Sequence, residues 1–313
     1  MTEITNSIKQ RFVKDFKLPI NLIQEPYFDY FVELYNPDFD TFGKLKLLQS
    51  FLDTCKDQED FFQIGNNVST SVKEFIQNTK AYELMNNADM NKFPQSKNLS
   101  QQNIYIVPNI DKELISIDLE KANFNSFKLF GIAEETGVNT YRELIAKFTE
   151  QEYFQQSKMF RQVIFGDLNP ARQQKIQRYI IGQLCDKLTA NGCEISSASS
   201  DEIIVKNKTN TKEIEDILSD VPNELKFFRV EKFHFSRIGE DFDFFVKYTE
   251  QKDGAVKKEF KNSPGHLFPQ IYKKHLNLEP NQYDMLFYHD GYLAEFKEPI
   301  FKAEPILNKK VKP

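Results

Sequence analysis

Two short apolar stretches with carboxylates at one end constrain this chain more than any other feature of its sequence. Residues 114–119 read Leu-Ile-Ser-Ile-Asp-Leu, and residues 201–205 read Asp-Glu-Ile-Ile-Val. Their alternating and β-branched residues predict two strands, with Asp118 near the end of one and Asp201-Glu202 at a turn into the other. If these strands are neighbours, three carboxylates converge and need cations to neutralise them. Two divalent ions held by carboxylates are typical of phosphoryl transfer.

The rest of the chain predicts an α+β protein. Residues 1–100 have the apolar spacing of helices, and a long helix over 171–190 should end at Asn191-Gly192. A helix over 141–153 is expected to begin with a capping box formed by Thr140 and Glu143. The first of the two carboxylate-bearing strands is expected over 113–119, and further strands at 104–107, 232–237, 244–249 and 256–261. Further helices are expected at 212–218 and 267–275, and a hairpin at 285–296.

Composition narrows the class of protein. At 313 residues, with 40% hydrophobic residues and 30 Phe, the chain can bury a sizeable core. It has no apolar run long enough to span a membrane and no signal-like N-terminus, which predicts a cytoplasmic protein without a membrane partner. Three scattered cysteines fit a reducing compartment. The wealth of Asn, Lys, Ile and Phe is typical of an AT-rich genome, such as that of a phage, whose proteins work in the host cytoplasm.

The order of these features resembles that of right-hand, palm-containing nucleic-acid polymerases, and the motifs are nearest to those of bacterial repair-type DNA polymerases. The resemblance covers residues 104–206. Ser200-Asp201-Glu202-Ile203-Ile204 is similar to their third motif, and Ile117-Asp118-Leu119 followed by Asn123-Phe124 is similar to the first. Residues 158–166, Lys-Met-Phe-Arg-Gln-Val-Ile-Phe-Gly, resemble the motif of the fingers.

The resemblance implies a role for each matching residue. Asp118 and Asp201 would hold two Mg²⁺ (or Mn²⁺) ions, with Glu202 in a supporting catalytic role. Lys158 and Arg161, which share a helical face with Phe165, would neutralise the triphosphate while the aromatic ring packs against the base. Phe124, or Asn123 beside it, would close off the ribose 2′ position.

Three parts and one function follow as expectations. Residues 1–100 would form a helical region, residues 101–210 a palm-like antiparallel sheet with a fingers-type insertion at about 125–190, and residues 211–313 a C-terminal α+β region. The expected function is nucleotidyl transfer on a nucleic acid by a small polymerase-like enzyme. Its partners would be nucleic acid and nucleoside triphosphates.

The segment 247–274 interleaves basic and aromatic residues, a pattern that suits a groove for a nucleic-acid strand. Because the net charge is −5, nucleic-acid contacts must come from such a local groove. The candidate contacts are Lys257, Lys258, Lys261, Lys273 and Lys274, and Lys252 belongs to the same segment. For any single lysine, a solvated strand face remains an alternative.

Other functions remain open. A nucleotide cyclase on the same kind of palm would need no basic groove. A non-catalytic replication accessory protein would keep only nucleic-acid binding, with Asp118 and Asp201 as ordinary solvated turn residues. Asp284, Glu295 and Lys297 have the spacing of a metal-dependent nuclease, but the 16 residues after Lys297 are too few to complete that fold.

Overall fold

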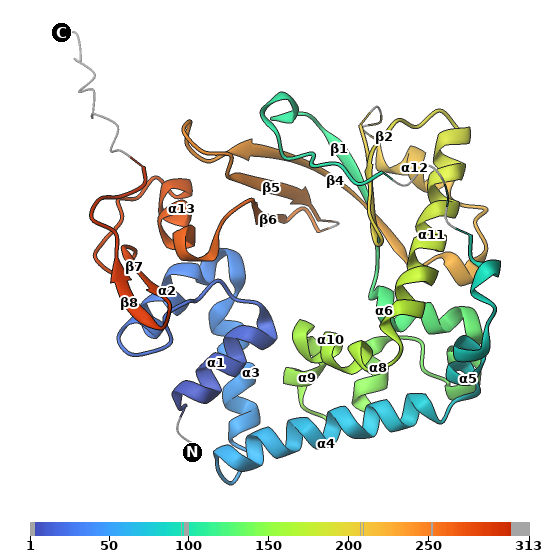
Figure 1. The fold of residues 1–313 in the computed structure, drawn as a ribbon, viewed down its shortest axis with the longest axis horizontal. Helices are drawn as coiled ribbons and strands as arrows, with labels where there is room; N and C mark the ends of the chain where they lie inside the picture. Colours follow the sequence, from blue (N-terminus) through green and yellow to red (C-terminus); the bar gives the residue numbers. More distant parts are fainter. Residues whose placement is uncertain are drawn as a thin grey trace.

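The computed structural model describes residues 4–94, 96, 100–206, 208, 210–251 and 253–301. These residues form an α+β fold, as predicted, in which a twisted antiparallel sheet stands above a body of helices (Figure 1). The long helix α4 runs along the side of the helical body farthest from the sheet (Figure 1). Within the described ranges, no helix combines the length and the apolar character needed to cross a membrane.

The bounds of the elements are as follows. The helices are α1 (Asn6–Phe16), α2 (Tyr27–Phe39), α3 (Thr41–Leu52), α4 (Gln58–Gln77), α5 (Lys80–Asn87), α6 (Ala122–Asn125), α7 (Ile132–Thr136), α8 (Tyr141–Ala146), α9 (Glu152–Gln156), α10 (Lys158–Gly166), α11 (Pro170–Ala190), α12 (Thr211–Ile217) and α13 (Phe268–His275). The strands are β1 (Leu114–Leu119), β2 (Ile195–Ala198), β3 (Glu202–Val205), β4 (Phe228–Arg237), β5 (Phe245–Glu250), β6 (Val256–Lys261), β7 (Leu286–His289) and β8 (Tyr292–Glu295).

The main sheet has the strand order β2-β3-β1-β4-β5-β6 with antiparallel neighbours. Taking the chain from β1 through α11, β2, β3 and α12 to β4 gives the β-α-β-β-α-β arrangement, with smaller helices inserted between β1 and α11. Because β4 pairs with β1, the sheet continues across the boundary expected near residue 210. The predicted C-terminal region therefore supplies half of the same sheet.

The two faces of the sheet have different environments. On one face, Ile115, Ile117 and Val205 are completely buried in the main core, on the side covered by α11 and α12. On the other face, Leu114 and Phe233 form a smaller core with Ile104 from the segment that precedes β1. That segment covers only one end of the face. The other end carries charged side chains and is the part relevant to function.

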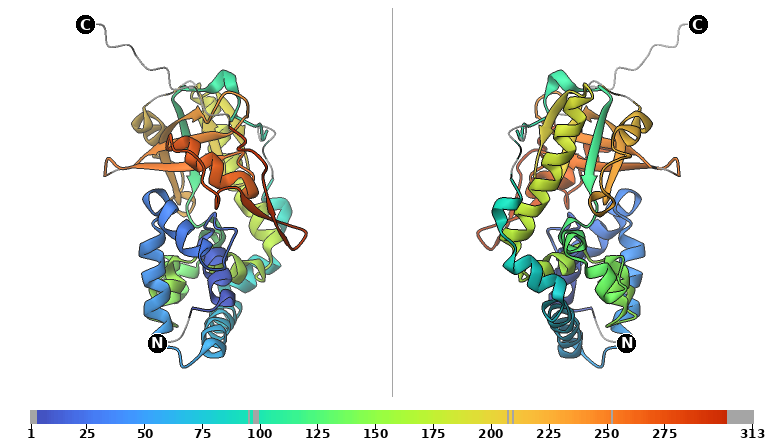
Figure 2. Two further views of the ribbon diagram at one scale, coloured as in Figure 1. Left: turned by 90° about the vertical axis from the view of Figure 1, so that its left-hand side faces the viewer. Right: turned by 90° about the vertical axis from the view of Figure 1, so that its right-hand side faces the viewer.

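The helical body and the sheet share one core. Phe12 from α1, Ile117 from β1 and Tyr272 from α13 belong to the same cluster of buried residues. The three expected parts of the chain therefore contribute to one common core, and the C-terminal part has a further small cluster around Ile238, Val246 and Ile271. Two further views show the helical body below the sheet from either side (Figure 2).

Most expected elements are present, with two corrections. The strand expected at 104–107 is wrong, because this segment turns back on itself and Asn109 donates from its side chain to the carbonyl of Ile104 (3.0 Å). Pro108 also removes a backbone donor there. The helix expected over 141–153 is split into α8 and α9, although its capping box is confirmed by the bond from the Glu143 amide to Thr140 Oγ1 (3.1 Å).

Candidate active site

Strands β1 and β3 are interior strands of the sheet, and they bring the predicted carboxylates together at its charged end. Asp118 pairs directly with Glu202 in the antiparallel register. The amide of Leu119 donates to the carbonyl of Asp201 at 2.8 Å, which ties the tip of the β2–β3 hairpin to the end of β1. Side chains directly opposite each other on antiparallel strands are close enough to interact. The expected convergence of the two strands is therefore confirmed.

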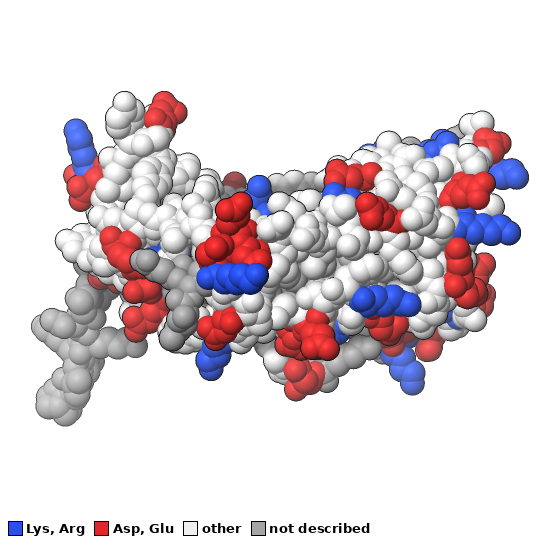
Figure 3. Space-filling view, turned by 90° about the horizontal axis from the view of Figure 1, so that it is seen from below, with Lys and Arg blue, Asp and Glu red and all other residues white. Residues whose placement is uncertain are grey.

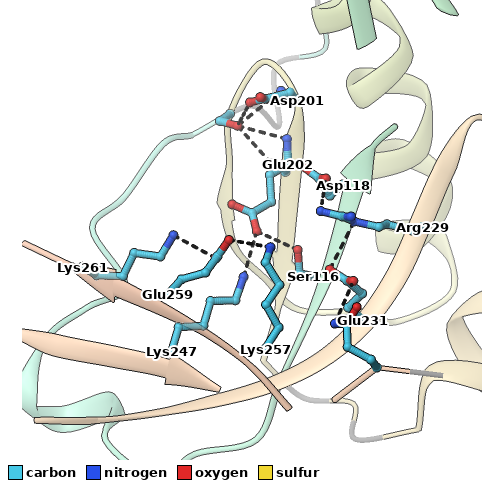
Figure 4. Close-up of polar contacts among 12 residues, drawn as sticks. Ser116, Asp118, Asp201, Glu202, Arg229, Glu231, Lys247, Lys257, Glu259 and Lys261 are labelled. Atoms are coloured by element: carbon cyan, nitrogen blue, oxygen red, sulfur yellow. Dashed lines mark hydrogen bonds and ion pairs between the residues drawn. The ribbon is translucent and has the colours of Figure 1, made fainter. Parts of the chain in front are cut away.

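Asp118 has a cationic partner that its sequence context did not indicate. Arg229, opposite Asp118 on β4, places Nη2 at 2.8 Å from Asp118 Oδ2 and Nε at 3.2 Å from Glu231 Oε2 (Figure 4). The side chain of Asp118 is 27% exposed, so solvent still reaches it. Arg229 therefore acts as an internal counter-ion for this carboxylate. Alternation within 228–237 places Arg229 and Glu231 on one face, and this was the signal available in the sequence.

The other two carboxylates also have partners. Ser116 Oγ donates to Glu202 Oε1 at 2.6 Å, and Lys247 Nζ lies 3.4 Å from the same oxygen (Figure 4). Lys247 is almost completely buried and its ammonium lies 4.1 Å from the centroid of the Phe233 ring. Asp201 is exposed and accepts a bond from Ser199 Oγ at 2.9 Å.

The other two carboxylates affect the ionisation of Asp118. Burial raises the pKa of Asp118 to about 6, Arg229 opposes this rise, and the negative charges of Glu202 and Asp201 add to it. Two like charges near a carboxylate disfavour its ionised form. An added cation would relieve this crowding. Carboxylate and hydroxyl oxygens are donors that suit Mg²⁺, which is bound in proteins through one or two carboxylates and water.

No protein-family model and no curated protein matches this sequence. The function therefore has to be argued from the geometry alone. In the described residues, no three side chains of His, Cys, Asp or Glu are arranged as a ready metal site. For Asp118 and Asp201 to hold a metal ion, the Asp118–Arg229 pair would have to open.

A second group of charges lies next to the carboxylates and consists of cations. Arg161 in α10 has its guanidinium 5.6 Å from the centroid of the buried Tyr141 ring. Burial, and then the nearby charges of Arg161, Arg229 and Lys158, lower the pKa of Lys121, which directly follows the end of β1. The predicted residues Lys158 and Arg161 therefore lie near Lys121, which the sequence did not single out and which follows the strand that carries Asp118 by two residues.

Phe124 and Phe165 do not have the positions expected of nucleotide contacts. Both side chains are completely buried, with their ring centroids 6.3 Å apart. A ring without exposed surface cannot stack on a sugar or a base. Their predicted roles as sugar gate and base-packing residue are therefore corrected: both belong to the core beneath α10. The turn into α6 directly after β1 changes the alternation on which the Phe124 assignment relied.

The lysines of the expected nucleic-acid groove are mostly neutralised within the protein. Lys257 and Lys261 lie 2.7 and 3.2 Å from the two oxygens of Glu259. Lys258 lies 3.0 Å from Asp38, and Lys273 lies 3.8 Å from Asp284.

Alternation along β6 also puts Lys258 on the opposite face from Lys257 and Lys261. Lys274 lies in α13 and is partly buried, and Lys252 lies outside the described residues. These lysines therefore do not present one continuous basic track. The side of the molecule seen in Figure 3 has acidic and basic side chains interspersed, without a continuous basic stripe.

The residues of the possible nuclease site are not assembled for catalysis. Asp284 is completely buried and accepts bonds from the Tyr30 hydroxyl and the Asn281 amide, both at 2.8 Å. Glu295 and Lys297 are exposed. Asp284 therefore holds the segment after α13 to α2, which is a structural role, and the alternative nuclease constellation is not formed.

Proposed function

We propose that this protein catalyses metal-dependent nucleotidyl transfer on a nucleic acid, as a small polymerase-like enzyme. The observation that carries this proposal is the meeting of Asp118, Asp201 and Glu202 at the ends of adjacent strands, with Lys121 two residues beyond β1 and Lys158 and Arg161 near Lys121. Carboxylates for a divalent cation next to basic side chains for a polyphosphate are the two requirements of phosphoryl transfer.

In this proposal each charged side chain has a distinct task. Asp118 and Asp201 would hold Mg²⁺ or Mn²⁺, with Glu202 in support, and the bound ions would activate a hydroxyl nucleophile and stabilise a leaving pyrophosphate. Lys158 and Arg161 neutralise the negative charge of the triphosphate. Arg229 neutralises Asp118 in the metal-free protein, where the pair has an N–O distance of 2.8 Å.

A second candidate is a non-catalytic protein that binds nucleotides or nucleic acid. Two observations favour it: Arg229 already pairs with Asp118, and the described residues contain no preformed group of three metal-ligating side chains. In this case Arg229 would be a permanent partner of Asp118, and the carboxylates would stabilise the ends of β1 and β3 without binding metal.

The deciding experiment is extension of a labelled primer on DNA and RNA templates, with each nucleotide set and with Mg²⁺ or Mn²⁺. Asp118→Asn and Asp201→Asn should each lower the rate by about a thousandfold or more, because metal binding contributes several kcal/mol to the transition state. The thermal stability of both variants should hold or rise, since a like charge is removed from a crowded cluster.

Asp216→Asn is the matched control, because Asp216 is an exposed carboxylate on α12 outside the cluster. Its rate should equal that of the unmodified protein. Absence of extension under every condition would favour the non-catalytic candidate, whereas equal rates in all three variants would remove Asp118 and Asp201 from the catalytic site.

A further inference from the structure

The backbone conformations of Lys17 and Lys121 are unusual for lysine. Among the described residues, eight non-glycine residues have positive φ, and six of them are Asn or Asp: Asp40, Asp111, Asn169, Asn262, Asn277 and Asp290. The other two are Lys17 (φ 52°) and Lys121 (φ 44°). Asn, Asp and Gly adopt this left-handed region at lower energy than other residues. At these two positions, Asn, Asp or Gly would adopt the observed backbone conformation at lower energy than lysine does.

These two lysines come together with Lys158 and Arg161 through the packing of three elements. Lys17 directly follows α1, and the end of α1 is fixed to α9 and to the start of α10 by two bonds to Asp15. Ser157 Oγ donates to its carbonyl at 3.3 Å, and the Tyr153 hydroxyl donates to its carboxylate at 2.8 Å. Lys121 reaches the same helix from the end of β1, where α6 packs on α10 through Phe124 and Phe165.

No described carboxylate forms an ion pair with any of these four cations, which we call the cation cluster. Burial, followed by the charges of Lys158 and Arg161, lowers the pKa of Lys17. For Lys121, the neighbouring Glu120 only partly offsets the same effects. The net charge of the protein is −5, yet these like charges have no carboxylate partner. A bound anion would therefore stabilise the cluster.

We propose that Lys17 and Lys121 are phosphate-binding residues, which together with Lys158 and Arg161 form the site for the triphosphate of a nucleotide. This inference deepens the proposed function and rests on its assignment of Lys158 and Arg161 to the phosphates. It makes the N-terminal helical region part of the binding site, because Lys17 is contributed by the chain that follows α1.

The arrangement of the cluster favours a triphosphate over a nucleic-acid strand. Its residues come from the end of α1, the turn after β1 and the start of α10, and both Lys17 and Lys121 lie near Lys158 and Arg161. A triphosphate carries several charges on adjacent phosphates, whereas a strand spreads one charge per nucleotide along its length. Lys121 also follows β1, the strand that carries Asp118, which suits a ligand whose phosphate reacts at that carboxylate.

The test is isothermal titration of the whole chain with inorganic triphosphate in EDTA, so that no metal contributes. Lys17→Asn and Lys121→Asn remove the charge with a residue that tolerates positive φ. Each should weaken triphosphate binding by about tenfold or more, and the double variant by about a hundredfold. Lys14→Gln, which removes an exposed charge one turn earlier on α1, should change the affinity by less than about twofold.

Two outcomes overturn the inference. If both asparagine variants bind triphosphate as tightly as the unmodified protein, Lys17 and Lys121 are not part of the site. If a single-stranded oligonucleotide without a terminal phosphate shows the same losses and triphosphate does not displace it, the cluster binds a strand instead.

The result is separable from the test of the proposed function. If triphosphate binding depends on both lysines but no primer is extended, the phosphate site stands and the proposed catalysis fails. If extension depends on Asp118 but neither asparagine variant affects triphosphate binding, only the phosphate site fails.

Discussion

Two groups of basic residues in this protein differ in how their charge is neutralised. The cation cluster (Lys17, Lys121, Lys158 and Arg161) forms no ion pair with a described carboxylate. The second group, which we call the paired lysines, consists of Lys257, Lys258, Lys261 and Lys273, and each has a carboxylate within 4 Å. In the sequence, the second group is the denser and more conspicuous one.

The difference shows that the density of lysines along a chain is a poor guide to an anion site. Glu259 alone neutralises Lys257 and Lys261, and Asp38 reaches Lys258 from the other end of the sequence. An ion pair within the protein leaves less charge for a ligand. Unpaired cations that are held close together keep their charge available, and folding brings them together despite their repulsion.

The largest expected effect concerns the core under the cation cluster. Phe124→Ala should lower the free energy of unfolding by about 3–5 kcal/mol, as truncation of a buried Phe does. Phe42→Ala is the control, because Phe42 is 46% exposed. Urea denaturation measures both. A loss below about 1 kcal/mol for Phe124→Ala would mean that the ring is not a core residue, and would reopen its role as a sugar gate.

The next effect compares the contributions of a buried and a more exposed lysine ion pair to stability. Lys258→Gln should lower the free energy of unfolding by about 1–3 kcal/mol, because it leaves the carboxylate of Asp38 buried without its cation. That side chain is 9% exposed and otherwise accepts a bond from Tyr272 at 2.9 Å. Lys257→Gln, at a more exposed pair, should change it by less than about 1 kcal/mol. Equal effects would remove the distinction between the two pairs.

Glu259→Gln removes the carboxylate partner of Lys257 and Lys261, so these two lysines should then resemble the unpaired cations of the cation cluster. Burial acts to raise the pKa of Glu259, but Lys261, Lys257 and Lys247 outweigh it and bring the pKa to about 2. A depressed acid pKa stabilises the fold above the unfolded value of 4.5, and this stability is lost as the pH falls towards 2.

After allowance for solvent screening, the substitution should lower the free energy of unfolding by about 1–2 kcal/mol at pH 7. Denaturation as a function of pH should show the difference shrinking below the unfolded pKa. Oligonucleotide binding should increase and become more salt-dependent, because Lys257 and Lys261 lose their partner. A constant stability difference from neutral to acidic pH would contradict this account.

The smallest expected effect has the opposite sign. Lys121→Asn should leave the free energy of unfolding unchanged or raise it by up to about 0.5 kcal/mol, since a repelled charge is removed and Asn tolerates the left-handed conformation. Added salt should reduce any gain, which urea denaturation at two salt concentrations measures. A loss above about 1 kcal/mol would show that Lys121 has a structural partner, and the contrast with Lys258 would disappear.

Much of the fold could be predicted from local sequence patterns. The alternation in 114–119 and 203–205, and the 3.6-residue spacing in 171–190, depend only on which side of a strand or helix each side chain faces. β1, β3 and α11 are present as expected, and the structure adds that β1 and β3 are neighbours. The expected strand at 104–107 fails because those residues cover the sheet through their side chains without joining its hydrogen-bond ladder.

The sequence by itself therefore determined the α+β class, the long helix and the two strands that end in carboxylates, whereas the tertiary structure made these strands neighbours. Only the tertiary structure decided which charges are paired. Arg229 is over 100 positions from Asp118, and Lys17 is over 100 positions from Lys158. Residue periodicity is a local property of the chain, whereas charge pairing depends on strand register and helix packing between distant segments. The turn after β1 therefore overrides the alternation that favours Phe124 as a sugar gate, and only the fold brings Lys17 and Lys121 near Lys158 and Arg161.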